Sequence, residues 1–197
     1  MKFKVYKYIK ITSTNDKAIN FIKNKNIEFG YIHTDMQTLG RGTRGKKWIS
    51  QKGNLFGSIF FPLKKEYPSF DEFSFINPVI VFDVVKSFCV NCNLALKWPN
   101  DILLNQKKIS GILQEIVKKK NLYYLIIGIG INLTSNPKIN NVKTTNVLNE
   151  TKIKINRDIA VQKIILSYES FFFNLHKYKF QKYRDKANFL SIKNSEL

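Results

Sequence analysis

The chain has 197 residues, a length that suits one domain able to bury its own core without disulfide or metal staples. It has no apolar run near the roughly 18 residues of a membrane span and no signal-peptide core at its start, so we expect a cytoplasmic protein without membrane contact. The 33 basic and 14 acidic residues leave a net charge of +19, which attracts polyanions. Because the charges are dispersed rather than grouped in blocks, compositional drift is the preferred explanation.

The hydrophobic pattern predicts strands grouped in the middle of the chain with helices around them. Alternation predicts a strand over 3–12, after which Ser13 followed by Asp16 indicates a helix start. Further strands are expected at 29–34, 54–62, 94–98, 101–104, 109–117 and 122–131. A helix should end near Val90, with Pro78 in its first turn. A late helix is expected where an apolar stripe runs from Val161 to Leu175. The pattern of 134–157 favours neither helix nor strand. We therefore expect a single α+β domain over 1–197 with a mixed, largely antiparallel sheet and flanking helices.

Two motifs that usually mark binding or redox sites lack the surrounding sequence that such sites require. The stretch 40–45 reads G-x-G-x-x-G, but no helical stripe follows it, so a dinucleotide-binding turn is excluded. Cys89 and Cys92 form a C-x-x-C, yet no further ligands stand at zinc spacing and no redox context surrounds them. We interpret the cysteines as reduced and structural.

Residues 35–53 predict a long loop, and its segment Gly40–Trp48 is rich in glycine and cations. Glycines let backbone N–H groups approach an anion, guanidinium groups grip carboxylate or phosphate oxygens, and Trp48 offers a flat face for a ring. Taken alone, this segment is better explained as an exposed basic loop or an RNA-binding patch than as an anion site.

A second segment runs from Lys97 to Glu115 and contains a turn at Pro99–Asp101. If the flanking runs pair as strands, Lys97, Asp101 and Lys108 project at one sheet end, which favours a prearranged anion and Mg²⁺ site. The alternative is that Asp101 only caps the turn.

Together the motifs GRGTRGKKW, KWPNDI and KKISGIL resemble those of the biotin–protein ligase family, in the same order. Ser13-Thr14-Asn15, Gln37 and the run 128–132 also resemble family positions. The resemblance implies the catalytic fold shared by class II aminoacyl-tRNA synthetases and biotin ligases. It also implies the reaction: ATP and Mg²⁺ activate biotin to biotinyl-5'-AMP, and biotin passes to a lysine of a biotin carboxyl carrier protein.

The resemblance further implies roles for individual residues. As catalytic residues it implies Lys108, Arg41, Arg44 and Asp101, the last also in indirect contact with Mg²⁺. Biotin contacts are implied for Ser13, Thr14, Asn15, Gln37, Arg41, Gly42, Thr43, Lys108 and Gly111. Contacts with ATP or the adenylate are implied for Arg44, Lys46, Trp48, Lys97, Asn100 and Asn132. Thr43 departs from the family, in which many members carry a further arginine.

The same comparison sets expectations for domains and partners. We expect no N-terminal helix-turn-helix and hence no DNA partner, a C-terminal β domain that is absent or vestigial, and a homodimer as a plausible assembly. Two other functions remain open: a lipoate- or octanoate-handling enzyme of the same superfamily, and a basic nucleic-acid-binding module with salt-dependent affinity.

Overall fold

A seven-stranded sheet in the order β1-β2-β3-β7-β6-β5-β4 forms the centre of the computed structural model, which describes residues 2–191. Only β1 and β2 run parallel, and every other neighbouring pair is antiparallel. The strands are β1 (Val5–Ile11), β2 (Gly30–Gln37), β3 (Leu55–Pro62), β4 (Leu94–Lys97), β5 (Asp101–Leu104), β6 (Lys107–Lys119) and β7 (Leu122–Ile131). The helices are α1 (Thr14–Asn24), α2 (Phe70–Lys86), α3 (Val147–Thr151), α4 (Arg157–Phe173) and α5 (Phe180–Leu190). The predicted α+β class with a mixed, largely antiparallel sheet is confirmed.

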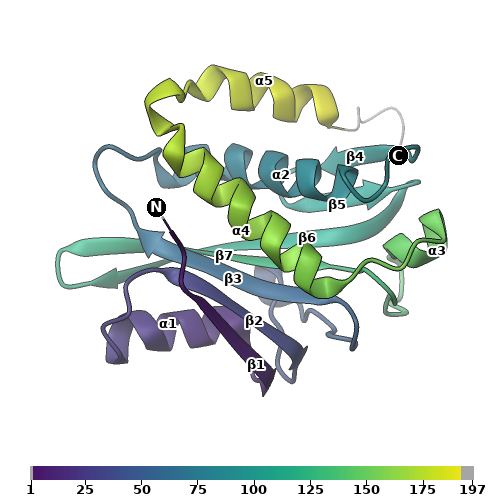
Figure 1. Ribbon diagram of the computed structural model, residues 1–197, viewed down its shortest axis with the longest axis horizontal. Coiled ribbons are helices and arrows are strands. Elements are labelled where there is room, and N and C mark those ends of the chain that lie inside the picture. Colours follow the sequence, from purple (N-terminus) through teal and green to yellow (C-terminus); the bar gives the residue numbers. More distant parts are fainter. Residues whose placement is uncertain (1, 192–197) are drawn as a thin grey trace.

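The two faces of the sheet carry helices unequally: α2, α4 and α5 lie on one side and α1 on the other (Figure 1). In β7 the alternation of side chains assigns each residue to a face. Leu125, Ile127, Ile129 and Ile131 join the larger core with α2 and α4, whereas Tyr124 and Ile126 pack with α1. Beyond Ile126, the α1 side of β7 continues as Gly128 and Gly130, where the apolar core gives way to the site described below.

Helix α1 begins where the sequence predicted. The Ser13 hydroxyl accepts a hydrogen bond from the Asp16 backbone N–H at 3.3 Å, which satisfies one of the free donors of the first turn. Ala18, Phe21 and Ile22 then pack on the sheet, so the amphipathic stripe holds the N-terminus of α1 against the strand ends.

The prediction for Pro78 was wrong. A capping box between Ser69 and Glu72 starts α2 at Phe70, which leaves Pro78 in the middle of the helix rather than in its first turn. Most of α2 from Phe73 to Val85 is buried, so packing against the sheet holds the helix despite the missing backbone N–H.

The ambiguous stretch 134–157 contains the short helix α3, which Asn146 caps through the backbone N–H of Asn149. The predicted loop starts later than expected, because β2 extends to Gln37. Both cysteines are free thiols, as predicted, and burial raises the pKa of Cys89 to about 12.

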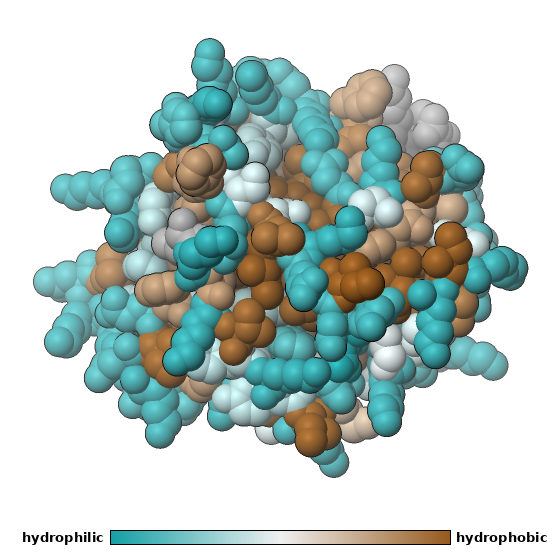
Figure 2. Space-filling model, viewed as in Figure 1, coloured by the Kyte–Doolittle hydropathy of each residue, from teal (hydrophilic) through white to brown (hydrophobic). Residues whose placement is uncertain are grey.

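Within residues 2–191, none of the helices is both long and apolar enough to span a bilayer. On the face formed by α4 and α5, hydrophilic side chains surround scattered apolar patches (Figure 2). The exposed apolar side chains of α4 include Leu166 and Phe173.

Candidate active site

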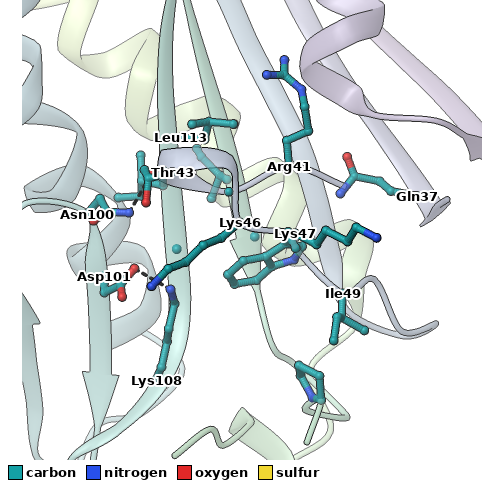
Figure 3. Close-up of a pocket in the computed structure, with 18 of the residues that line it drawn as sticks. Gln37, Arg41, Thr43, Lys46, Lys47, Ile49, Asn100, Asp101, Lys108 and Leu113 are labelled. Atoms are coloured by element: carbon teal, nitrogen blue, oxygen red, sulfur yellow. Dashed lines mark hydrogen bonds and ion pairs between the residues drawn. The ribbon is translucent and has the colours of Figure 1, made fainter. Parts of the chain in front are cut away.

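A cavity of about 450 Å³ opens on the α1 side of the sheet and collects the two segments that the sequence singled out. The loop between β2 and β3 supplies Arg41, Gly42, Thr43, Lys46 and Trp48, and the turn and strand on the other side supply Asn100, Asp101 and Lys108 (Figure 3). The predicted convergence of these segments is confirmed. The volume is in the range of small-molecule sites.

The floor of the cavity is made of glycine. Gly111 of β6 and Gly130 of β7 are paired directly across the two strands, and the indole of Trp48 lies against both. A Cβ on Gly111 would lie 2.6 Å from Trp48 Cζ3, and a Cβ on Gly130 would also collide with the ring. The glycines therefore let a flat side chain rest on the backbone of the sheet.

The loop that carries Arg41 and Trp48 is folded as a hairpin over the cavity. The Gly42 N–H donates to the Lys46 carbonyl at 2.7 Å, and the Trp48 N–H donates to the Gly40 carbonyl at 2.9 Å. Arg44 stands at the tip with φ of 55°, followed by Gly45 with φ of 73°. The reversal at this tip directs Arg44 into solvent, so it does not line the cavity.

Arg41 is held by carboxylates at the α1 edge of the cavity. Its two terminal nitrogens each donate to one Glu115 oxygen at 2.7 Å, and Asp16 lies 2.8 Å from the same guanidinium. The hydrogen bonds with Glu115 raise the pKa of Arg41 above its ordinary value. Figure 3 shows the side chain directed away from Asp101 and Lys108, so Arg41 fastens the loop to α1 and β6.

Lys108 and Asp101 form an ion pair in the cavity, with 2.7 Å between Lys108 Nζ and Asp101 Oδ1. The antiparallel pairing of β5 with β6 brings them together. The predicted turn at Pro99–Asp101 pairs β4 with β5. Lys46 reaches toward the same pair from the loop (Figure 3). Two ammonium groups and one carboxylate leave a net positive charge, which suits an anion.

The opposite end of the cavity is polar and lies at the N-terminus of α1. Thr14 Oγ1 lies 3.2 Å from Gln37 Oε1, and the Thr14 backbone N–H donates to that oxygen at 2.9 Å. Behind them, Ser58 of β3 lies 2.7 Å from Thr14 Oγ1 and 2.5 Å from Asn15 Oδ1. Gln37 Nε2 donates to Ser50 at 3.0 Å, which ties the far end of the loop to the same network.

Asn132 presents a buried polar atom without a partner. Its Nδ2 donates to the Thr145 carbonyl at 3.0 Å, and its Oδ1 has no hydrogen bond among the described residues. Asn132 is 2% exposed and lines the cavity. A buried acceptor left unpaired is costly, so this oxygen is available to a donor on a ligand.

The wall near Asn132 comes from a segment that the sequence left unassigned. Pro137, Ile139, Val142 and Thr144 line the cavity, and the neighbouring backbone brackets Lys108: its N–H donates to the Lys143 carbonyl and its carbonyl accepts from Thr145 N–H. No motif marks this segment. The lysine is thus fixed on both sides of its own backbone.

Most predicted site residues are brought together, with two exceptions. Those lining the cavity are Ser13, Thr14, Asn15, Gln37, Arg41, Gly42, Thr43, Lys46, Trp48, Asn100, Asp101, Lys108, Gly111 and Asn132. Arg44 and Lys97 do not line it. Ser58, Glu115 and Asp16 are partners of the site that no motif indicated. The alternation of side chains in β3 was the available signal that Ser58 shares a face with Phe56 and Phe60.

Comparison with known proteins agrees with this geometry. Residues 5–132 match the model that defines the Biotin/lipoate A/B protein ligase family. The chain is 30% identical over 174 residues to the bifunctional ligase/repressor BirA of Bacillus subtilis, covering 82% of this chain and 52% of that protein. It is 34% identical over 103 residues to the biotin–[acetyl-CoA-carboxylase] ligase of Paracoccus denitrificans, covering 51% of this chain and 43% of that protein.

Among solved structures, the biotin protein ligase of Aquifex aeolicus in complex with biotin and ATP superimposes with a TM-score of 0.79 at 26% identity. The match covers 96% of this chain and 78% of that one. This chain therefore spans about half the length of the B. subtilis relative and most of the A. aeolicus structure. On the family match over most of its length, the chain belongs to the biotin/lipoate A/B protein ligase family.

Proposed function

We propose that this chain uses ATP to activate biotin as biotinyl-5'-AMP and then transfers biotin to a lysine of a biotin carboxyl carrier protein. The observation that carries the proposal is one cavity that gathers three chemically different parts: a polar end at Thr14 and Gln37, cations at Lys108 and Lys46, and an unpartnered acceptor at Asn132. The relatives named as biotin ligases, and the A. aeolicus enzyme with biotin and ATP bound, support the same assignment.

The polar end suits the cyclic urea of biotin, which has one carbonyl between two N–H groups. Ser13 Oγ accepts from Asp16 N–H, which leaves the Ser13 proton free to donate to a carbonyl. Thr14 Oγ1 and Gln37 Oε1 offer acceptors for N–H groups. The dithiolane ring of lipoate and the alkyl chain of octanoate have neither group, so they would leave these buried polar atoms unpaired.

The cationic middle of the cavity suits the two anionic groups that react, the carboxylate of biotin and the α-phosphate of ATP. A biotin carboxylate oxygen attacks the α-phosphorus of ATP, the bond to the bridging oxygen breaks, and pyrophosphate leaves. Lys108, with Lys46 above it, would offset the repulsion between carboxylate and phosphate. The indole of Trp48, which rests on Gly111 and Gly130, would present its other face to the acyl-adenylate and exclude water from that side.

The part of the cavity assigned to the nucleotide is identified by Asn132 and its unpartnered oxygen. The exocyclic amine of adenine is a donor that would satisfy the free Oδ1, whereas the guanine carbonyl at that position is an acceptor and would repel it.

Mg²⁺ would enter the site together with the phosphates of ATP. Asp101 is the one carboxylate that lines the cavity among residues 2–191, and no cluster of three acidic, histidine or cysteine side chains occurs in that range. A site with one carboxylate plus substrate phosphates fits Mg²⁺, which keeps several waters. When bound, the ion would neutralise phosphate charge.

The second step needs a neutral amine. The carrier lysine must lose a proton before it attacks the acyl carbon and displaces AMP, and Asp101 would receive that proton once Lys108 faces the phosphate. A carrier with an acidic face would match the net charge of +19.

Biotin-dependent exchange of labelled pyrophosphate into ATP tests activation, and labelled biotin incorporated into a purified carrier domain tests transfer. We expect both with biotin, and neither with lipoate or octanoate. Exchange with lipoate instead of biotin would reassign the chain within its family. Absence of exchange with all three acids, together with tight salt-sensitive binding of RNA or DNA, would replace the proposal by the nucleic-acid function.

A further inference from the structure

We propose that Ser58 determines which groups the polar end of the cavity accepts, by fixing the direction of the hydrogen bonds made by Thr14. The inference rests on the proposed function, since it concerns how that site chooses an acid with N–H groups. Ser58 is fully buried in β3 and does not line the cavity, so it acts as a positioning residue through Thr14.

The direction of the network starts at Glu115. This carboxylate is paired with Arg41 and can only accept, so the Asn15 atom that faces it at 2.6 Å must be Nδ2. The second hydrogen of Nδ2 is directed to the Leu113 carbonyl at 3.5 Å. With both donors of Asn15 used on this side, the oxygen Oδ1 must face Ser58.

The register of the sheet makes room for this amide. Ser58 and Gly128 are direct partners across β3 and β7. A Cβ on Gly128 would lie 2.5 Å from Asn15 Oδ1, so only glycine lets the amide lie over β7 and reach Ser58. Asn15 therefore has one available orientation.

The number of available protons then fixes the direction of the remaining hydrogen bonds. Three close contacts follow one another: Asn15 Oδ1 to Ser58 Oγ at 2.5 Å, Ser58 Oγ to Thr14 Oγ1 at 2.7 Å, and Thr14 Oγ1 to Gln37 Oε1 at 3.2 Å. Only the two hydroxyl groups carry protons for them, because Gln37 Oε1 already accepts from Thr14 N–H and is a carbonyl oxygen. Ser58 must donate to Asn15, and the single Thr14 proton then belongs to the shorter of its two contacts, Ser58 at 2.7 Å rather than Gln37 at 3.2 Å.

The longest contact is the one left without a proton. Thr14 Oγ1 and Gln37 Oε1 therefore stand side by side as acceptors, and both residues line the cavity. Two acceptors in contact repel each other until a donor reaches them, so the site favours a ligand that brings N–H groups. Without Ser58, the Thr14 hydroxyl would donate to Gln37 Oε1. That oxygen would then accept two hydrogen bonds from Thr14 and would no longer be free to accept one from the ligand.

The test compares biotin with an analogue in which one ureido N–H is replaced by oxygen, a cyclic carbamate. We expect wild type to bind biotin at least about tenfold more tightly than the carbamate, and Ser58→Ala to lose most of that ratio because its affinity for biotin falls about 10-fold to 100-fold. Titration calorimetry gives both dissociation constants. Ser110→Ala is the matched control: Ser110 is also a fully buried serine, but its hydroxyl donates to the Gly130 carbonyl at 2.8 Å.

The outcomes separate the inference from the proposed function. If wild type binds biotin and makes the adenylate but Ser58→Ala keeps the wild-type ratio, or weakens both ligands equally, the inference is wrong and the function stands. If wild type binds no biotin, the proposed function fails first. Should Ser58→Ala not fold, Ser58→Cys retains the shape with a weaker donor; a wild-type ratio in that variant also overturns the inference, and a reduced ratio supports it.

Discussion

Arg41 and Glu115 are joined by two parallel hydrogen bonds of 2.7 Å, and this pair fastens one end of the cavity loop to strand β6. The sequence resemblance implied that Arg41 is catalytic and contacts biotin, whereas its guanidinium in the structure faces Glu115 and Asp16. Its contribution is thus expected in the lifetime of the closed loop.

Arg41→Ala should release the adenylate about tenfold faster, since the loop loses its anchor to α1 and β6. The measurement is the half-life of labelled adenylate on the protein after gel filtration. Arg44→Ala removes a cation of the same loop that points into solvent, and it should have a much smaller effect. Equal effects of the two variants would show that loop charge, rather than the anchor, retains the adenylate.

Lys108→Ala should reduce adenylate formation by at least about 100-fold, because it removes the ammonium group that pairs with Asp101 at 2.7 Å and would offset the charge of the reacting phosphate. Lys107 is the matched control. It is the neighbouring residue but pairs with Glu150 at 3.2 Å outside the cavity, so Lys107→Ala should leave pyrophosphate exchange near wild type. A Lys108→Ala variant with normal exchange would remove this lysine from the reaction.

Ligand binding should change the fluorescence of Trp48 and not that of Trp98. Trp48 lines the cavity, whereas Trp98 is 51% exposed and packs beside Phe75. Titration with biotin and ATP should therefore give a signal in wild type and in Trp98→Phe, and none in Trp48→Phe.

A Gly130→Ala variant, whose new methyl group would collide with the indole of Trp48, should bind nucleotide at least about tenfold more weakly.

Asn132→Ala should lower the affinity for ATP about tenfold without lowering the affinity for GTP, since the exocyclic amine of adenine would donate to Oδ1 and the guanine carbonyl at that position would not. Competition between the two nucleotides in the exchange reaction measures the ratio. Asn146→Ala serves as control: this buried asparagine caps α3 and should affect stability without altering nucleotide choice. Parallel losses for ATP and GTP would place Asn132 outside base recognition.

His33 should make the protein less stable in mild acid. Burial, followed by the charges of Arg157 and Lys7, lowers the pKa of His33 below its ordinary value. The unfolded chain therefore binds a proton at higher pH than the folded one, and the free energy of unfolding falls as pH drops below about 6.5. Urea titrations between pH 5 and pH 8 should show a shallower decline in His33→Gln, while the exposed His176→Gln serves as control.

Some features of the fold followed from local sequence alone. The Ser13 cap, the stripe of Ala18, Phe21 and Ile22, and the turn before Asp101 each depend on residues a few positions apart, and the structure confirms them. Pro78 was misplaced because the signal that starts α2, the Ser69 and Glu72 capping box, lies further upstream than the apolar stripe suggested.

The sequence by itself determined the chemistry brought to this protein: the cations, glycines, tryptophan and aspartate of two motifs, whose order indicated the family. Only the tertiary structure decided which of them meet. Pairing of Ser58 with Gly128 and of Gly111 with Gly130 depends on strands far apart in the chain, and so does the contact of Arg41 with Glu115. Side-chain direction at such contacts is set by sheet register and loop reversal, which short-range pattern does not encode.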